Sequence, residues 1–247
     1  LQRSSNSRRA TSAALVGIGN AHLQLGSPEE AITPLSEALA HGESSRAPVE
    51  TAAANLGLSH AFKALGRFDE ALELRSGGIT SPVLVLGASP YEAASEYVRC
   101  GIRATITDLE MAEALSAASC KLGKKAKVHI KVDTGMGRIG FSPNETAEIV
   151  SRVAALPGVE CEGIFTHFAT SDCSDLSYTK EQHELFLEAL ESLGKKGISI
   201  PIRHCCNSGA TLSFPEWGME GVRPGQLLAG MYPTDEVPRS IPILPGF

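Results

Sequence analysis

The sequence is poor in aromatic residues, in positive charge and in long apolar runs. Aromatic residues make up 5% of its 247 positions, with a single Trp. Basic residues number 22 against 28 acidic ones without a dense Lys/Arg run, so nothing supports nucleic-acid binding. No stretch approaches ~18 consecutive apolar residues, which argues against a membrane-spanning helix. With 43% hydrophobic and 20% charged residues, the composition predicts an ordered chain rather than a disordered one.

Metal-ligand spacing is also missing. The six cysteines form no C-x-x-C pair, and the adjacent Cys205 and Cys206 are poorly placed to bridge to each other. We interpret them as reduced thiols of a cytosol-like compartment, which predicts a cytoplasmic protein without a metal site. The chain starts at Leu1 and stops at Phe247, so we expect a processed chain or a fragment. Its first ten residues resemble a basic tail or the remnant of a transit peptide.

The first third contains an internal repeat. Displaced by 40 residues, Ala13 aligns with Ala53, and the helical pattern of small and apolar positions recurs over both copies. Each copy is interpreted as a helix pair, the first with helices over 13–25 and 28–40. The spacing resembles the tetratricopeptide repeat, although Pro34 departs from it and any Ala-rich helical hairpin remains an alternative. We predict a helical-repeat domain over 1–75.

The residues from 76 to 247 alternate short apolar runs with amphipathic stretches. Helices are predicted near 90–100, 109–119, 144–156 and 179–193, with Asp108 and Asn144 as N-caps and Ser89 opening a capping box. Strands are predicted at Val83–Leu86, Ala104–Ile106, Val128–Val132, Gly163–Thr166, Ile198–Cys205 and Gly221–Leu228. This alternation predicts parallel βα units, in either a doubly wound sheet or a (β/α) barrel.

Polar residues gather where the predicted strands end. Singly, each has an ordinary structural reading, such as a buried lysine, a structural histidine, a helix cap or a turn. Together they indicate a site, because function collects at the carboxyl ends of barrel strands. The Asn207-Ser208-Gly209 turn and Gly225 suit a phosphate, and Arg138 and Arg223 are permanent cations for an anionic ligand.

Four motifs carry a resemblance to one family. Lys131-Val132-Asp133-Thr134-Gly135-Met136-Gly137-Arg138-Ile139-Gly140 resembles the signature of alanine racemase, a fold-type III pyridoxal 5′-phosphate (PLP) enzyme. Thr166-His167-Phe168-Ala169, His204-Cys205-Cys206-Asn207-Ser208 and Val222-Arg223-Pro224-Gly225 follow in the family's order and spacing, from about Glu70 onward. The resemblance implies a TIM-type barrel, of which about six of eight strands are present, over 76–247.

The resemblance also implies roles for individual residues. His167 packs against the PLP ring, and Arg223 hydrogen-bonds the ring nitrogen. Asn207, Ser208 and the Gly225 backbone hold the phosphate. Arg138 lies near the cofactor's phenolic oxygen and the substrate carboxylate, and Lys131 matches a lysine that is carbamylated in many members and positions that arginine. Alanine is the implied substrate, and the family is a homodimer.

Two departures from the family pattern limit what this chain does by itself. The strand motif that carries the Schiff-base lysine, resembling V-K-A-N-A-Y-G-H, is absent, and the first lysine is Lys63. The tyrosine-bearing C-terminal domain is also absent from the printed sequence. We therefore expect weak or no PLP binding and little racemisation by this chain alone. The alternatives are a repeat-containing protein-interaction module with a vestigial PLP barrel and a PLP-binding protein without catalysis.

Overall fold

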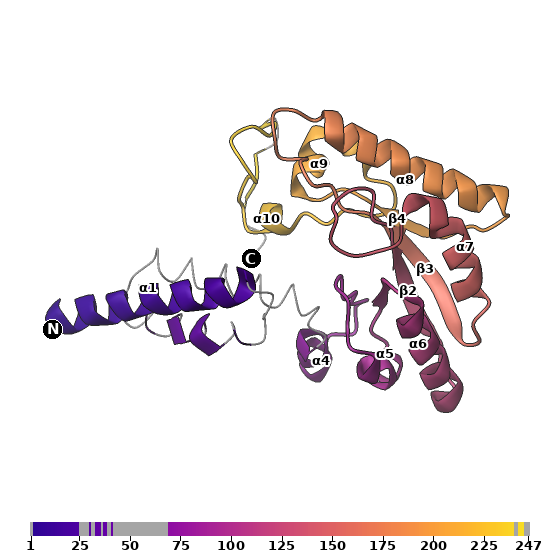
Figure 1. Ribbon diagram of the computed structural model, residues 1–247, viewed down its shortest axis with the longest axis horizontal. Coiled ribbons are helices and arrows are strands. Elements are labelled where there is room, and N and C mark those ends of the chain that lie inside the picture. The colour runs from indigo at the N-terminus through magenta and orange to yellow at the C-terminus, as the bar shows by residue number, and fades with distance from the viewer. Residues whose placement is uncertain are drawn as a thin grey trace. The chain divides into compact units, whose positions relative to one another are not determined.

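The structure is a computed structural model that describes residues 2–24, some positions between 30 and 41, 69–239 and 242–244. The chain divides into two compact units, Leu1–Glu73 and Leu74–Phe247. In the first unit, α1 spans Gln2–Gln24 (Figure 1), so the helix predicted over 13–25 is confirmed and begins earlier. The second copy of the predicted repeat lies almost entirely outside the described residues, and the repeat pair stays a prediction.

The second unit is built on a parallel sheet of four strands in the order β1-β2-β3-β4. The strands are β1 (Ala104–Ile106), β2 (Ala126–Lys131), β3 (Val159–Phe165) and β4 (Ile202–His204). Val128, Ile130 and Ile164 are fully buried on one face of the sheet, and His129 and Lys131, which alternate with them on β2, are buried on the other, as expected of parallel strands that are covered on both faces. The register pairs Lys131 with Phe165 and Phe165 with His204, so β2, β3 and β4 end at the same level.

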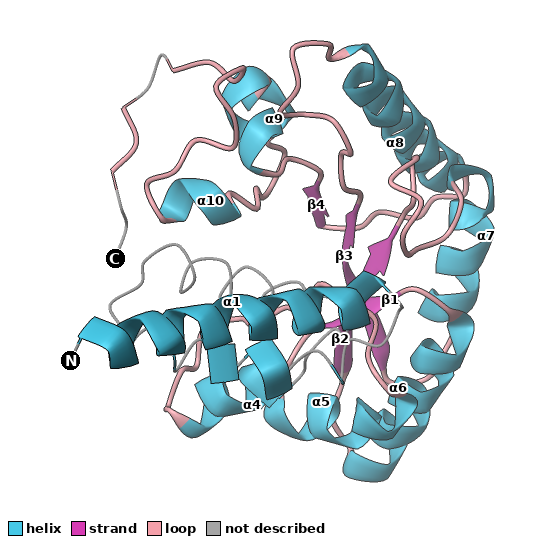
Figure 2. Cartoon of the chain, turned by 60° about the vertical axis from the view of Figure 1, so that its left-hand side comes forward, coloured by secondary structure: helices cyan, strands magenta, loops and turns pink. Residues whose placement is uncertain are grey.

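Helices connect and cover the strands. α6, α7 and α8 lie on one side of the sheet in Figure 2, and both α6 and α7 pack on β3. The helical segments of this unit and its boundary are α4 (Asp69–Ser76), η1 (Tyr91–Ala93), α5 (Ala94–Cys100), α6 (Leu109–Leu122), α7 (Pro143–Ala154), α8 (Ser177–Lys195), α9 (Ser208–Ser213), η2 (Pro215–Trp217) and α10 (Gly225–Leu228). The four helices predicted between 90 and 193 are therefore confirmed.

Two of the six predicted strands are wrong. Only Leu84 of the run 83–86 pairs, through an isolated parallel bridge to Arg103. The run 221–228 is not extended, because Pro224 has no N–H to donate to a sheet and the residues after it form α10. The described residues of the second unit therefore hold four strands rather than six.

Of the three predicted helix caps, one is confirmed and two are wrong. Asp108 caps α6, because its side chain accepts a hydrogen bond of 2.8 Å from the backbone N of Met111. Asn144 does not cap α7. The N-cap is Ser142, and Pro143 occupies the first helical position, which the fixed φ of proline favours. The capping box at Ser89 is also wrong, since its hydroxyl lies 2.6 Å from the Tyr97 hydroxyl instead.

None of the described helices combines the length and the apolar composition that crossing a bilayer requires. This finding agrees with the absence of a long apolar run from the sequence.

Replacing Asp108 with alanine removes the α6 cap. We expect Asp108→Ala to lower the free energy of unfolding by about 1 kcal/mol, because the N–H of Met111 loses its acceptor. Asn144→Ala is the matched control and costs nothing, since Asn144 lies inside α7 rather than at its cap. Urea denaturation followed by circular dichroism compares the two, and equal losses would contradict this account of the caps.

Candidate functional site

The predicted site residues lie at the carboxyl ends of the strands. Lys131 ends β2, His167 follows β3 by two residues, and Asn207 and Ser208 follow β4 at the start of α9. Arg223 and Gly225 return to the same edge in the segment before α10, where the backbone N of Arg223 donates to Cys206 O at 2.9 Å. The positions expected from the sequence therefore converge on one edge of the sheet.

The loop after β2 is organised by one carboxylate. Asp133 accepts hydrogen bonds from the backbone N–H groups of Gly135, Gly137 and Arg138 at 3.0, 3.1 and 3.1 Å. Burial opposes ionisation of Asp133, but these three donors and the Lys131 ammonium outweigh it and lower the pKa of Asp133. The loop thereby holds the backbone of Arg138 in place while leaving its side chain exposed.

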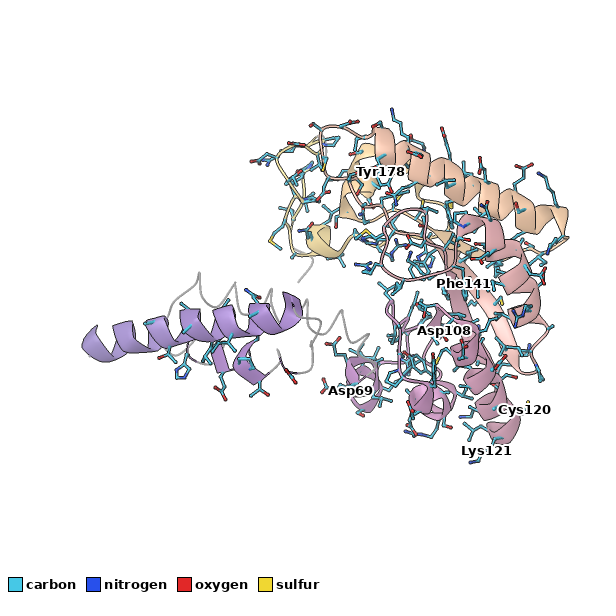
Figure 3. The ribbon with its side chains drawn as sticks, viewed as in Figure 1. Asp69, Asp108, Cys120, Lys121, Phe141 and Tyr178 are labelled. Atoms are coloured by element: carbon cyan, nitrogen blue, oxygen red, sulfur yellow. The ribbon has the colours of Figure 1, made fainter. Side chains whose placement is uncertain are left out.

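The same loop packs against α8. The Tyr178 hydroxyl donates to Gly135 O at 2.9 Å, and Figure 3 shows Tyr178 at the start of α8. Gly135 has a φ of 126°, and a Cβ built on it would lie 2.2 Å from the Tyr178 hydroxyl oxygen. Only glycine fits both the backbone conformation and this close approach.

Lys131 is a buried amine. Its side chain is 1% exposed, its Nζ donates to Val132 O at 2.8 Å, and it lies 5.7 Å from the centre of the Phe165 ring. Burial lowers the pKa of Lys131 to about 8, assisted by the charges of Arg138 and Arg223 and opposed by that of Asp133. Lys131 is therefore still mostly protonated at pH 7, but a larger fraction of it is the neutral amine than in an exposed lysine.

Arg223 is fixed by four of its five side-chain N–H donors. Nη1 lies 2.7 Å from Nδ1 of His204 and donates to His204 O at 3.1 Å. Nη2 donates to Thr166 O at 2.6 Å and to Cys205 O at 3.1 Å. The guanidinium also lies 5.1 Å from the centre of the Phe165 ring. Among the described contacts, only the Nε–H donor is left uncommitted.

His167 is positioned through its backbone and its neighbours. The buried Gln182 of α8 donates to His167 O at 3.3 Å and accepts from the Ala169 N–H at 2.9 Å. The hydroxyls of Thr166 and Thr134 lie 2.7 Å apart, which joins the ends of β2 and β3. Gln182 thus connects α8 to the segment that presents His167, whose side chain is half-buried.

The residues predicted to hold a phosphate lie around the start of α9. Asn207 caps the helix by accepting from the Ala210 N–H at 3.1 Å and from the Ser171 hydroxyl at 2.6 Å, so its amide is committed to the fold. The Ser208 hydroxyl accepts from the Gln226 N–H at 3.2 Å, and its own proton has no recorded acceptor among the described residues. A Cβ built on Gly225 would meet no atom within 4 Å, so space lies beside it.

Sequence reasoning missed a buried group beneath this edge. In the sequence His204 stands out only within the motif His204–Ser208, and His129 and Glu162 belong to no motif, yet Nε2 of His204 lies 2.9 Å from Nδ1 of His129. Nε2 of His129 in turn lies 3.5 Å from the Glu162 carboxylate. The available signal was polar residues inside otherwise apolar strand runs, where an unpaired polar group is costly.

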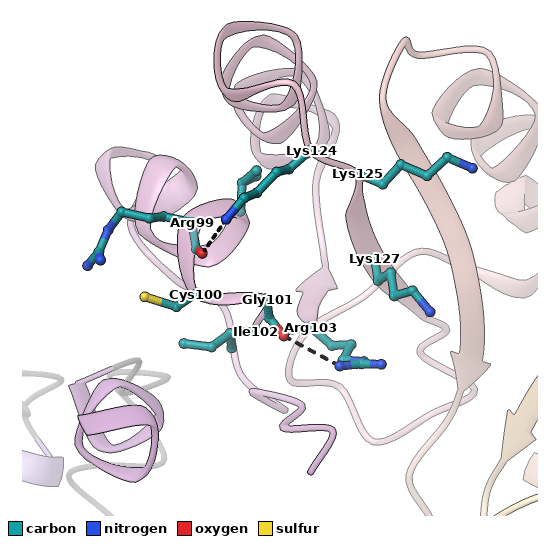
Figure 4. Close-up of a pocket in the computed structure, with 9 residues that line it drawn as sticks. Arg99, Cys100, Gly101, Ile102, Arg103, Lys124, Lys125 and Lys127 are labelled. Carbon is teal, nitrogen blue, oxygen red and sulfur yellow. Dashed lines mark hydrogen bonds between the residues drawn. The ribbon is translucent and has the colours of Figure 1, made fainter. Parts of the chain in front are cut away.

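A pocket lies elsewhere, at the opposite ends of the strands. It encloses about 410 Å³ between α5 and the starts of β1 and β2 (Figure 4) and is rich in cations, from Arg99, Arg103, Lys124, Lys125 and Lys127. Lys124 donates to Arg99 O at 3.2 Å, at the carboxyl end of α5, where cations complement the helix dipole. The pocket contains none of the predicted site residues.

The fold and site together define a parallel βα domain of the barrel type, with polar and cationic side chains gathered at the carboxyl ends of its strands. The sequence model of the family described as alanine racemase, N-terminal domain, matches residues 43–233. The chain therefore belongs to this family. The match begins closer to the N-terminus than the resemblance from about Glu70, and it overlaps the second predicted repeat.

Individual relatives agree. Alanine racemase of Desulfovibrio desulfuricans is 49% identical over 72% of this chain and 48% of its own length. The alanine racemase of Clostridium perfringens is 48% identical over 68% of this chain and 44% of its own length. The chain thus spans about half the length of the curated relatives it matches.

Solved structures give the same result. An alanine racemase of Clostridium difficile in complex with cycloserine aligns with a TM-score of 0.71 at 38% identity, over 73% of this chain and 50% of that one. The Bacillus anthracis enzyme with bound L-Ala-P aligns with a TM-score of 0.65 at 33% identity, over 76% and 51%. The fold is therefore that of the TIM-type barrel domain, which decides against the doubly wound alternative.

The lowered pKa of Lys131 predicts a pH-dependent stability. Below pH about 8 the lysine is protonated in both states, and the folded protein bears the full cost of burying the charge. Between pH about 8 and 10.5 the unfolded chain binds a proton that the folded chain has released, so stability rises with pH. Lys131→Met removes this cost and is expected to stabilise the protein at pH 7 by roughly 3 kcal/mol.

Urea denaturation at several pH values measures the difference between Lys131→Met and the wild type. The advantage of the variant should shrink as the pH rises from about 8 to 10.5. Lys125→Met is the control, because that ammonium is exposed and its removal should give no such trend. A constant difference across this pH range would show that the Lys131 amine is not destabilised by burial.

Proposed function

We propose that this chain supplies the PLP- and alanine-binding face of an alanine racemase, the enzyme that interconverts L- and D-alanine. Alanine racemases are PLP-dependent. The observation that carries the proposal is the state of Arg223, which four hydrogen bonds hold with one N–H donor left over. Such a donor fits a single acceptor, such as a pyridine nitrogen.

The charge of Arg223 determines what it does to that acceptor. Burial lowers the pKa of Arg223 to about 10, so the guanidinium keeps its proton at neutral pH. It would donate a hydrogen bond to the ring nitrogen without transferring the proton. PLP, when bound, supplies an electron sink that acidifies the α-proton of the amino acid, and an unprotonated ring makes that sink a restrained one.

The donors around α9 fit a phosphate. Ser208 has a hydroxyl proton to give, and the open space beside Gly225 admits an oxygen close to the backbone. Asn207 shapes the turn rather than donating, because its side chain bonds Phe168 O, Ser171 and Ala210 N. We propose that Ser208 and the backbone around Gly225 hold the phosphate, with Asn207 as the scaffold.

Arg138, Lys131 and His167 complete the proposed site. The exposed guanidinium of Arg138 is available for the carboxylate of alanine. Lys131, whose pKa of about 8 favours the neutral amine that carbamylation requires, would position Arg138. His167 would pack against the cofactor ring. Among the described residues, no specific observation favours the protein-interaction module over this function.

Binding of pyridoxine 5′-phosphate tests the cofactor site. This ligand keeps the ring and the phosphate but has no aldehyde, so it does not depend on a Schiff-base lysine. We expect Arg223→Lys to weaken binding by roughly tenfold or more, because lysine keeps the charge but loses the planar fork. Quenching of Trp217, the only Trp in the chain, reports occupancy close to β4, since Trp217 O accepts from Cys205 Sγ.

Arg203→Lys is the matched control for this experiment. Arg203 is also an arginine of the β4 region, but it pairs with Glu220, and its replacement should leave the affinity unchanged. Equal affinities of the wild type and Arg223→Lys would contradict the assignment of Arg223 to the ring nitrogen.

The alanine part of the proposal is tested with N-(5′-phosphopyridoxyl)-alanine, a stable ligand that adds an alanine carboxylate to the cofactor frame. We expect both its L and D forms to bind more tightly than pyridoxine 5′-phosphate, because a racemase accepts both hands. Arg138→Gln should remove roughly tenfold of that advantage, the size of a charge-assisted hydrogen bond, while Arg152→Gln on α7 should not. Titration calorimetry measures both, and an advantage that survives Arg138→Gln would exclude Arg138 as the carboxylate partner.

A further inference from the structure

A continuous chain of polar side chains leads from Arg223 down into the sheet. It runs from Nη1 of Arg223 to Nδ1 of His204 at 2.7 Å, and from Nε2 of His204 to Nδ1 of His129 at 2.9 Å. It ends at the Glu162 carboxylate, 3.5 Å from Nε2 of His129. His129 and His204 are each 5% exposed, so the chain is buried along its middle.

The protonation of this chain has one consistent direction. Arginine only donates, so Nδ1 of His204 must accept, and the proton of a neutral His204 then sits on Nε2. That N–H donates to Nδ1 of His129, which places the proton of His129 on Nε2, facing the carboxylate. Burial and the charge of Arg223 lower the pKa of His204 to about 3, which agrees with a neutral ring.

The far end of the chain is anchored by two cations. Glu162 on β3 accepts from Nε of Arg103 at 2.9 Å and from Nζ of Lys127 at 2.7 Å. Figure 4 shows the Arg103 and Lys127 side chains extending to the same side. Burial opposes ionisation of Glu162, but these donors outweigh it and lower the pKa of Glu162 to about 2. The carboxylate is therefore charged whenever the protein is folded near neutral pH.

The backbone makes room for this arrangement. A Cβ built on Gly163 would lie 2.2 Å from Nδ1 of His129, so a side chain at this position displaces the imidazole. The register of β2 against β3 also shifts between Val128 and His129, at the level where the ring is inserted. A β-bulge next to a site commonly redirects one side chain, and here the register shift coincides with the position of the His129 ring.

We propose that Glu162 is a remote positioning residue for Arg223, acting through His129 and His204. By accepting from His129, the carboxylate fixes both imidazoles in the tautomer that leaves Nδ1 of His204 free to accept from Arg223. If the direction reversed, an N–H of His204 would oppose an N–H of Arg223, and the guanidinium would lose its position. This proposal deepens the proposed function and rests on it for what Arg223 then binds.

The tautomers are tested directly by nitrogen NMR of ¹⁵N-histidine-labelled full-length protein, with signals assigned by His129→Asn and His204→Asn. In the wild type we expect both rings to be neutral with the proton on Nε2. Glu162→Gln removes the charge and adds an amide donor that can face His129. We therefore expect the His204 nitrogens to shift or broaden from tautomer exchange, although Glu162 does not touch His204.

Glu160→Gln is the matched control. Glu160 lies two residues earlier on β3, and its carboxylate lies 3.5 Å from Nζ of Lys125 and 3.7 Å from Nζ of Lys127. It is therefore not part of the series of side chains that runs from Arg223 to Glu162. We expect Glu160→Gln to leave the nitrogen signals of His204 unchanged. Gly163→Ala provides a second route, because it displaces the His129 ring while keeping Glu162. Unchanged His204 signals in a folded Glu162→Gln variant, or a proton on Nδ1 of His204 in the wild type, would overturn the proposal.

Ligand binding separates this proposal from the proposed function. We expect Glu162→Gln and Gly163→Ala to weaken pyridoxine 5′-phosphate binding by roughly two- to thirtyfold, and Glu160→Gln to leave it unchanged. A wild type that does not bind the ligand, while Glu162→Gln still shifts His204, refutes the proposed function and keeps the positioning chain. A wild type that binds with an affinity insensitive to Glu162→Gln refutes the positioning role alone.

Discussion

The rest of the site depends on the hydrogen bonding of one guanidinium. Arg223 donates to Thr166 O after β3 and to His204 and Cys205 at the end of β4, so it holds together the ends of two strands. These acceptors are neutral, and within the described contacts no carboxylate pairs with Arg223. The charge is therefore stabilised by dipoles and by the Phe165 ring rather than cancelled, which keeps it available to a ligand at the edge of the sheet.

The hydrogen bonding of Arg223 constrains the buried side chains below the edge of the sheet. An arginine held by an imidazole needs that imidazole neutral and in one tautomer, and a buried imidazole needs a partner for its second nitrogen. His129 provides that partner, and Gly163 provides the space for His129. The position of Arg223 at the edge of the sheet thus depends on Gly163 and His129, although neither residue lies at that edge.

The elements that the sequence predicted well are those with local causes. Runs such as 104–106 and 128–132 were recognisable because short runs rich in β-branched and apolar residues, set between helical stretches, are typical of buried parallel strands, and Asp108 was recognisable because capping acts within three residues. The run 221–228 misled because its apolar residues resemble a strand, whereas Pro224 excludes sheet pairing there. The chain through His129, Glu162 and His204 was not predictable, since only the register of three strands brings these residues together.

The N-terminal segment shows why helical periodicity alone identifies a repeat poorly. In the first unit, a Cβ built on Gly19 would lie 2.4 Å from Cγ of Leu35, and the Ser12 hydroxyl donates to Ala38 O at 2.7 Å, as close helix pairing requires. Small residues at such spacing serve any two helices packed together, in a repeat or around a barrel. Because the family match begins at residue 43, the second predicted copy shares its sequence with the racemase domain. The small-residue pattern of that copy therefore does not by itself distinguish a repeat from the family's own sequence, and the repeat pair stays a prediction.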